Sequence, residues 1–132
     1  MSLIAIPEKF ISADTSIAIN ATEVDGTDFT SVQLPLEYAD YASITCYVLG
    51  GHASCSLDVV FKFAAYESLR AMWDTIAYLT VNVTANGTTA VQKTVSITPQ
   101  IQKIKLLSIQ NQEAVAGYTA TCNASLFRKE RG

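Results

Sequence analysis

The chain has 132 residues and a net charge of −3, with 49% hydrophobic but only 16% charged residues. This length fits a single domain over residues 1–132, and the acidic balance argues against a broadly basic nucleic-acid-binding protein. Few charges and many Ser and Thr residues are typical of β proteins, and of chains that cover their surface with neighbours.

Apolar and polar residues alternate with a period of two along the chain, whereas helical periodicity is nearly absent. The alternation predicts strands over residues 2–6, 15–20, 27–38, 42–49, 53–65, 76–85, 88–98, 102–111 and 114–127. Eight or nine strands with at most one short helix predict an all-β fold, an antiparallel β-sandwich of jelly-roll type.

Proline and glycine set the expected ends of several strands. Pro7 is expected to stop the first strand, and Pro35 favours an edge strand or a break, because proline cannot donate to a ladder. Asp25-Gly26 predicts a turn. Residues 66–76 are ambiguous, since they fit either one or two helical turns or a loop that packs Trp73 under the sandwich.

A two-residue turn at Gly50-Gly51 would place Cys46 directly opposite Cys55, on the inward face of a hairpin. Their Cα atoms would then lie roughly 4.5 Å apart, so the pair is either a cross-strand disulfide or two buried thiols. His52 falls on the opposite face, and Cys122 is the remaining cysteine. Because the ligands do not converge, we expect no metal site.

A second hairpin is expected around Asn86-Gly87. The apolar residues on both sides of the turn are odd-numbered, namely Leu79, Val81, Val83, Val91, Val95 and Ile97. Odd positions pair with odd positions only across an odd-numbered loop. The parity therefore predicts a three-residue turn with a bulge, in which Gly87 has a positive φ.

Enzymatic chemistry has little support in the sequence. His52 has no acidic partner nearby, and no nucleophile elbow is present. The spacing of the carboxylates selects no pair for glycoside hydrolysis among Glu37, Asp40, Asp58, Glu67 and Asp74. Glu23, Asp25 and Asp28 lack the ligand order of a calcium loop. We therefore predict no catalytic residue, no metal site and no cofactor.

Candidate interface residues come from the irregular segment and from the basic C-terminal run. They are Tyr66, Met72, Trp73, Arg128, Lys129 and Arg131. Tyr and Trp anchor many protein interfaces, and they also stack on sugar rings or fill cores. Residues 1–74 carry ten acidic and three basic side chains, and residues 75–132 carry two and six. This asymmetry is either mixed in space by the sheets or suited to head-to-tail packing of copies.

The beginning of the chain lacks a basic stretch followed by an apolar run, so no signal peptide is expected. No apolar run reaches the roughly 18 residues of a membrane helix. We therefore expect folding in a reducing compartment, without contact with a membrane.

The run "IQKIKLLSIQNQEAVAGYTATCNASLF", residues 101–127, is similar to the closing strands of virion β-sandwiches. In general character the chain resembles a structural protein of a tailed bacteriophage, most of all a capsid decoration (cement) protein. The resemblance implies a jelly-roll-like protein that folds in the host cytoplasm and binds a capsid lattice in the virion, often as a homotrimer. A tail or head–tail accessory protein fits almost as well. The alternative from another class is a carbohydrate-binding β-sandwich.

Overall fold

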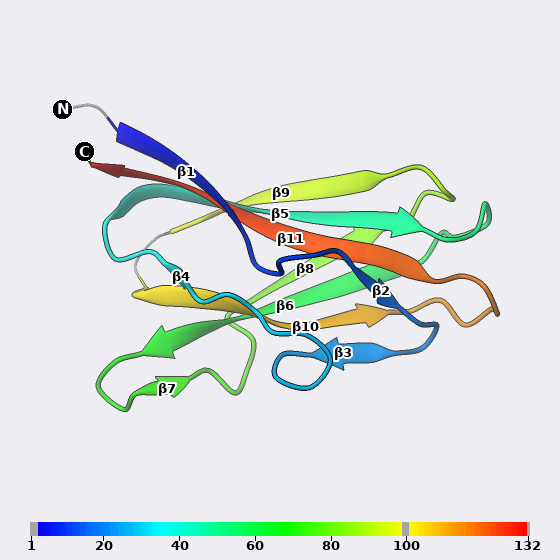
Figure 1. The fold of residues 1–132 in the computed structure, drawn as a ribbon, viewed down its shortest axis with the longest axis horizontal. Helices are drawn as coiled ribbons and strands as arrows, with labels where there is room; N and C mark the ends of the chain where they lie inside the picture. The colour runs from blue at the N-terminus through cyan, green and yellow to red at the C-terminus, as the bar shows by residue number, and fades with distance from the viewer. Residues whose placement is uncertain (1–2, 99–100, 132) are drawn as a thin grey trace.

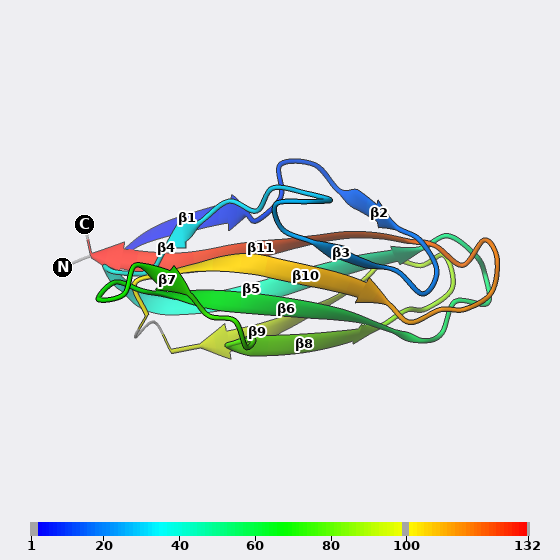
Figure 2. The same ribbon diagram turned by 90° about the horizontal axis from the view of Figure 1, so that it is seen from below.

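The computed structural model describes residues 3–98 and 101–131, and it describes side chains over residues 7–98 and 101–130. These residues form eleven strands in two antiparallel sheets that pack face to face, as Figures 1 and 2 show. The described ranges contain no helix, and hence no helix that could cross a membrane. The expectation of an all-β sandwich is confirmed, although several expected strands are divided into shorter pieces.

The first sheet, called here the β5–β11 sheet, has the order β1-β11-β5-β9, and β2 also pairs with β11. Its strands are β1 Leu3–Lys9, β2 Thr15–Ile17, β5 Ala39–Gly50, β9 Val91–Ile97 and β11 Ala120–Arg131. β1 and β2 are two parts of one edge, interrupted where the chain turns Phe10 and Ile11 into the core.

The second sheet, called here the β6–β10 sheet, has β10 and β6 at its centre. β3 and β4 lie along one side of β10, whereas β7 and β8 lie along the far side of β6. Its strands are β3 Thr22–Val24, β4 Leu34–Pro35, β6 Asp58–Glu67, β7 Met72–Trp73, β8 Leu79–Thr84 and β10 Lys103–Asn111.

The chain crosses between the sheets at each of the connections β5–β6, β8–β9, β9–β10 and β10–β11. This alternation is the jelly-roll path. The expected Gly50-Gly51 hairpin is therefore wrong, because β5 pairs with β11 and β9 while β6 pairs with β10 and β8. Residues 51–57 form the crossing, and the N–H of Gly51 donates to the Thr119 carbonyl at 2.8 Å.

The expected hairpin at Asn86-Gly87 is also wrong, since β8 and β9 belong to different sheets. The inward parity is confirmed: Val81 and Val83 are buried, and Leu79, Val91, Val95 and Ile97 pack against the core. Gly87 does have a positive φ, of 58°. The parity of a residue indicates whether it faces the core. It does not indicate whether two strands are paired in one sheet or lie in opposite sheets that face the same core.

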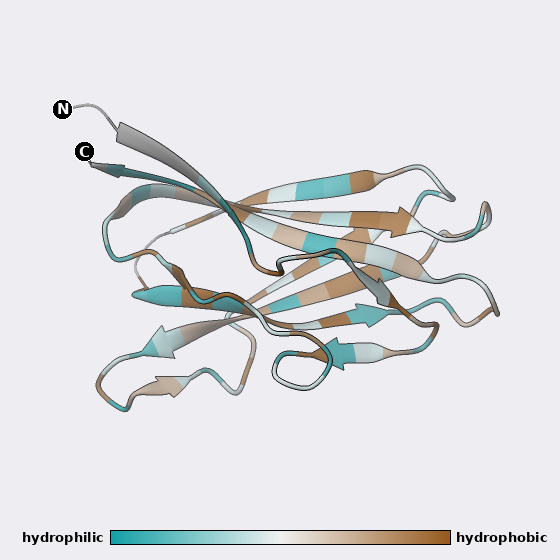
Figure 3. Cartoon of the chain, in the orientation of Figure 1, coloured by the Kyte–Doolittle hydropathy of each residue, from teal (hydrophilic) through white to brown (hydrophobic). Residues whose placement is uncertain are grey.

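The core lies between the sheets and is built by alternation along the central strands, visible as alternating bands of hydropathy in Figure 3. On β5 and β11 the buried apolar residues are even-numbered, and on β6 the fully buried aromatics Phe61 and Phe63 are odd-numbered. Phe63 packs against Phe10 with ring centroids 5.2 Å apart. β10 has a bulge between Leu106 and Ser108, so that Leu106 and Ile109 both point inward.

The prolines lie on edges. Pro7 lies within β1 and pairs with Phe127, so the expectation that it stops the strand is wrong. β1 pairs only with β11, and an edge strand tolerates a residue that cannot donate. Pro35 belongs to the edge strand β4, as expected.

Candidate interaction surface

The segment expected to be a helix or a loop is instead a β-hairpin formed by β6 and β7. Tyr66 pairs with Trp73, and their ring centroids are 5.2 Å apart at 64°. The Glu67 carboxylate accepts the backbone N–H groups of Leu69 and Arg70, at 3.0 and 2.7 Å, which closes the turn. Two acceptor bonds from one side chain give a defined turn without a helix.

The second strand of this hairpin is held to β6 by Asp74. Its backbone N–H donates to the Ala65 carbonyl at 2.9 Å, and its Oδ2 accepts the Ala65 N–H at 3.2 Å. Both ends of the short pairing are thus fixed by carboxylates, Glu67 at the turn and Asp74 at the base. The residues are acidic for a structural reason, which weakens any catalytic interpretation of them.

Two lysines of β10 lie over the rings of this hairpin. The Lys103 Nζ is 4.2 Å from the ring centroid of Tyr66 and 5.7 Å from that of Trp73. The Lys105 Nζ is 4.8 Å from the centroid of Trp73. Such contacts contribute about 0.5–2 kcal/mol each. We call these four residues, Tyr66, Trp73, Lys103 and Lys105, the aromatic–lysine cluster.

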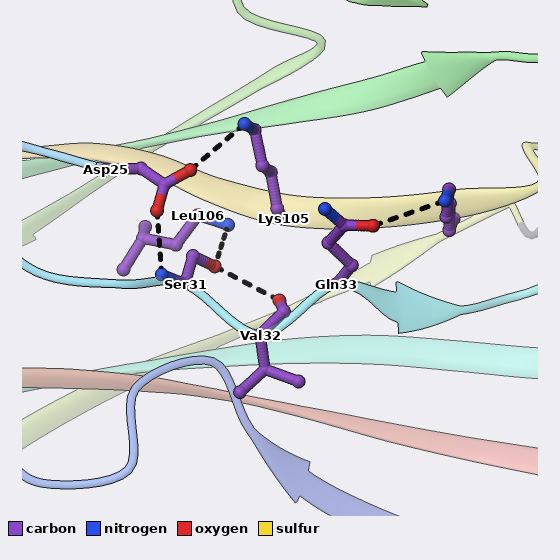
Figure 4. A network of polar contacts seen from close by, with 7 residues as sticks. Asp25, Ser31, Val32, Gln33, Lys105 and Leu106 are labelled. Atoms are coloured by element: carbon purple, nitrogen blue, oxygen red, sulfur yellow. Dashed lines mark hydrogen bonds and ion pairs between the residues drawn. The ribbon is translucent and has the colours of Figure 1, made fainter. Parts of the chain in front are cut away.

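A network of polar contacts fixes the lysines from the other side, as Figure 4 shows. The Lys105 Nζ lies 3.0 Å from Asp25 Oδ2, and both side chains are less than one fifth exposed, at 16% and 13%. The Asp25 Oδ1 accepts the Ser31 N–H at 2.7 Å. The Lys103 Nζ donates to Gln33 Oε1 at 3.2 Å. The cluster is therefore held rigid by the segment between β3 and β4.

Between β3 and β4, where β10 has no neighbouring strand on this side, the side chain of Ser31 supplies a hydrogen-bond acceptor to β10. Its Oγ accepts the backbone N–H of Leu106 at 2.9 Å and donates to the Val32 carbonyl at 3.1 Å. Without this hydroxyl, the Leu106 N–H would lack a partner at a buried position, which is unfavourable by about 1–3 kcal/mol. The interruption in the sheet edge is thus filled by a side chain.

The β6–β7 hairpin and the residues that follow it, called here the arm (residues 66–76), also expose apolar side chains to solvent. Leu69 is 84% exposed, Met72 is 51% exposed and Ile76 is 84% exposed. A shallow hollow of about 210 Å³ borders Met72 and Trp73. We call Leu69, Met72 and Ile76 the arm patch. Apolar residues on a rigid support next to a Trp are the features of an interface anchor.

The remaining candidate residues are placed differently. Arg128 is buried, at 5% exposed, and it pairs with Glu8 at 2.8 Å and Glu130 at 2.9 Å. Burial opposes its charge, but the hydrogen bonds to Glu130 and Glu8 outweigh this effect and raise the pKa of Arg128 above its ordinary value. It is therefore unavailable on the surface of this chain. Lys129 borders a separate hollow on the outer face of the β5–β11 sheet, and the side chain of Arg131 lies outside the described residues.

The pairing expected for Cys46 and Cys55 is wrong, because β5 and β6 are not neighbours. All three cysteines are free and buried. The nearest counterpart of Cys46 is Cys122, which lies diagonally across from it on β11. Burial, followed by the nearby Cys122, raises the pKa of Cys46 to about 12. Burial, followed by the carboxylates of Glu23 and Asp14, raises the pKa of Cys122 to about 12. Both are protonated, unreactive core residues at neutral pH.

The lone histidine lies on an exposed loop. Its Nδ1 accepts the Ser54 N–H at 3.0 Å, and its ring stacks on Tyr118 with centroids 4.4 Å apart. Within residues 3–98 and 101–131, no group of three or more His, Cys, Asp or Glu side chains could hold a metal ion. Among the acidic residues near β3, Asp25 is paired with Lys105, and Asp28 Oδ2 accepts the Val24 N–H at 2.9 Å.

The sequence selected Tyr66, Met72 and Trp73 as candidates but not the lysines that contact two of them. The signal was available in the strand 102–111, where Lys103 and Lys105 alternate with buried Ile104 and Leu106. Their contact with the hairpin could not be foreseen, because the pairing of β10 with β6 joins residues about forty positions apart.

No protein-family model matches the chain, and no curated protein matches it. Among solved structures, a chain in the structure of infectious bursal disease virus (Gx strain) is similar over 99% of this chain, with 13% identity and a TM-score of 0.53. The likeness shows the fold. This chain spans about a third of that one, 32% of its length.

Two further structures are similar at TM-scores of 0.46 and 0.47. The vertex protein of PRD1 has 13% identity, with 96% of this chain and 95% of that chain covered. The K1 cleaved adhesin domain of Lys-gingipain from Porphyromonas gingivalis W83 has 14% identity, with 98% and 99% covered.

Proposed function

We propose that the chain is a non-enzymatic structural protein of a virus particle, which binds a capsid lattice through the arm patch and the aromatic–lysine cluster. The jelly-roll path and the likeness to a chain of a virus structure support this role at the level of the fold. A decoration protein of a tailed bacteriophage is the form we favour, and a tail or head–tail accessory protein is the nearest variant.

The observation that carries the proposal is the exposed arm beside a fixed tryptophan. Leu69 and Ile76 are each 84% exposed, and Trp73, which lies between them in the sequence, is held by two lysines and by Tyr66. Interfaces concentrate their binding energy in a few such aromatic anchors. The arm of one copy is small, but many copies on a repeating lattice add their contacts through avidity.

Co-sedimentation with particles assembled from the major capsid protein of the same virus tests this proposal. Replacing both Leu69 and Met72 with Ser should strongly reduce the bound fraction while leaving the fold intact, since both side chains are exposed. The matched control is Val115→Ser, because Val115 is 54% exposed and belongs to the loop between β10 and β11. Figure 1 shows this loop at the opposite end of the sandwich from β7. Equal binding by the double variant would contradict the assignment of this surface.

The finer expectation of a homotrimer is tested separately by light scattering. A trimer would have about three times the 14.3 kDa mass of one chain. We favour the trimer because the resemblance to capsid decoration proteins implies it, and the exposed apolar residues of the arm patch are compatible with self-association. A monodisperse monomer at micromolar concentration would refute self-association and leave the lattice-binding proposal to the co-sedimentation result.

A further inference from the structure

The outer face of the β5–β11 sheet, which plays no part in the proposed lattice contact, carries two hollows. The first has a volume of about 220 Å³ and is lined chiefly by Lys9, Asp14, Thr45, Tyr47, Gln92 and Ser125. The second has a volume of about 380 Å³ and is lined chiefly by Asp40, Tyr41, Ser43, Ser96, Phe127 and Lys129.

The two hollows adjoin along the strands. Ser43 and Thr45 are successive outward residues of β5, and Ser125 and Phe127 are successive outward residues of β11. Successive residues on one face of a strand are about 6.6–6.8 Å apart. The hollows therefore lie end to end along β5 and β11, and we call the two together the groove.

We propose that this groove binds a short, linear, neutral oligosaccharide. Each hollow offers hydroxyl groups, one aspartate, one lysine and a tyrosine ring. Carboxylate, hydroxyl and ammonium groups supply both acceptors and donors for sugar hydroxyls. Tyrosine supplies a flat apolar ring against which the C–H face of a sugar can pack. One positive and one negative side chain in each hollow leave no net field that would favour a polyanion.

The two aromatic rings of the second hollow, those of Tyr41 and Phe127, are exposed to solvent. Tyr41 is 63% exposed and Phe127 is 40% exposed. Tyr41 pairs with Lys129 and Ser43 pairs with Phe127, so the two rings lie on a diagonal across neighbouring strands. Diagonal neighbours are about 7–8 Å apart. At this spacing one sugar unit can contact both rings.

The first hollow is built around a buried amide. Asn123 is only 6% exposed, and its Nδ2 donates to Asp14 Oδ1 at 2.8 Å and to the Ile11 carbonyl at 3.3 Å. These bonds hold the segment after β1 over the sheet and orient the Asp14 carboxylate, which keeps further acceptor capacity. On the floor, the hydroxyls of Thr45 and Thr94 share a 2.7 Å hydrogen bond. A preformed site loses little entropy on binding.

The floor of the groove argues against a protein partner. Protein interfaces are enriched in aromatic residues but depleted in Ser, Lys and Asp. Apart from the rings, this groove is lined largely by those depleted residues and by other hydroxyl-bearing and amide side chains. The arm patch on the β6–β10 sheet has the opposite character, since its exposed side chains are aliphatic.

Affinity electrophoresis in gels containing soluble neutral polysaccharides tests the inference, with mannan, galactan and xyloglucan as probes and dextran sulfate as the polyanion. We expect retardation by at least one neutral polysaccharide and none by dextran sulfate. Tyr47→Ala and Tyr41→Ala should each weaken the retardation about tenfold, as expected for loss of an aromatic anchor. Asp14→Asn should also weaken the retardation, because it replaces a carboxylate acceptor while keeping the size of the side chain.

Tyr78→Ala is the matched control, because Tyr78 is 40% exposed and lies outside the groove, just before β8. Its retardation should equal that of the unmodified chain, and the melting temperature of every variant verifies folding. Three results would overturn the inference: no retardation by any neutral polysaccharide, retardation by dextran sulfate alone, or an equal loss in the Tyr78→Ala and Tyr47→Ala variants.

Discussion

The carboxylate of Glu113 accepts the backbone N–H of Leu57 at 2.7 Å, a residue 56 positions earlier in the chain. It also accepts the Ser56 N–H at 3.1 Å, and the Glu113 side chain is buried, with only 4% exposed. The Glu113 N–H is in turn bound by Asn111 Oδ1 at 3.1 Å. One acidic side chain thus fixes the β5–β6 crossing against the β10–β11 loop.

Replacing Glu113 with Ala should lower the free energy of unfolding by about 2–4 kcal/mol, because two backbone N–H groups lose their acceptor at a buried place. Glu113→Gln keeps an acceptor oxygen and should lose distinctly less. Urea denaturation measures both variants. Equal destabilisation by Ala and Gln would mean that the negative charge, rather than the acceptor, matters at this position.

Gly50 and Gly26 should respond differently to alanine. A Cβ on Gly50 would overlap the carbonyl oxygen of Gly87 and press on Cys55, so Gly50→Ala should destabilise by about 1–3 kcal/mol through overpacking. Gly26 has φ +87° and open space around it, so its substitution involves only backbone strain, of about 1 kcal/mol.

Thermal melting of the two glycine variants in parallel distinguishes these mechanisms. In a Cys55→Gly background the loss caused by Gly50→Ala should shrink, whereas that caused by Gly26→Ala should not, because only at Gly50 does the added Cβ press on the Cβ and Sγ of Cys55. The backbone contact with Gly87 would remain, so the recovery should be partial. No recovery at all would assign the whole effect to the backbone.

Arg128 joins two carboxylates at the edge of the core, so its removal leaves Glu8 and Glu130 without their shared cation. Arg128→Met should destabilise the fold by about 2 kcal/mol or more, since losing one partner of a buried ion pair is strongly unfavourable. Adding Glu8→Gln and Glu130→Gln to that variant should restore part of the loss. Urea unfolding of the single and triple variants makes the comparison, and a triple variant less stable than the single one would contradict this explanation.

The cysteines predict both thiol reactivity and alkaline stability. In the folded chain at pH 8, Cys46 and Cys122 should react very slowly with a thiol reagent, whereas the unfolded chain should titrate three free thiols. The folded pKa of about 12 lies above the ordinary 9.0. The unfolded chain therefore loses protons first, and stability falls as the pH rises from about 9 toward 12.

A Cys122→Ala variant isolates this effect, because it removes one of the two raised groups. Its stability should fall less steeply than that of the unmodified chain across the same alkaline range. Identical slopes for the two proteins would show that other groups control alkaline unfolding.

Alternation along the strands was enough to predict an all-β sandwich, because facing one core fixes the parity of every strand. The alternating burial of Ile44, Cys46 and Val48 follows directly from it. Alternation does not, however, predict which strands pair with one another. Leu79–Val83 and Val91–Ile97 face the same interior from opposite walls, and local parity does not distinguish this arrangement from a hairpin.

The candidate surface was predictable only in part for a similar reason. Trp73 and Tyr66 lie close together in sequence, so a local argument found them. Lys105 reaches Trp73 only because β10 lies beside β6, and Arg128 is buried only because β1 brings Glu8 beside it. A charged residue near the end of a sequence is normally exposed. Arg128 is buried instead, because it pairs with Glu8 on the neighbouring strand.

The antiparallel pairing of β1 with β11 brings Leu3 opposite Arg131, and Figure 1 shows both strands reaching the same pole of the sandwich. A linker of a few residues between these two positions would close the backbone into a ring. New chain ends could then be opened in the exposed turn at residues 88–90. Such a circularly permuted molecule would carry its chain ends at residues 88–90, where the domain could be tethered to a solid support or to another protein, with the original pole and both outer faces left clear.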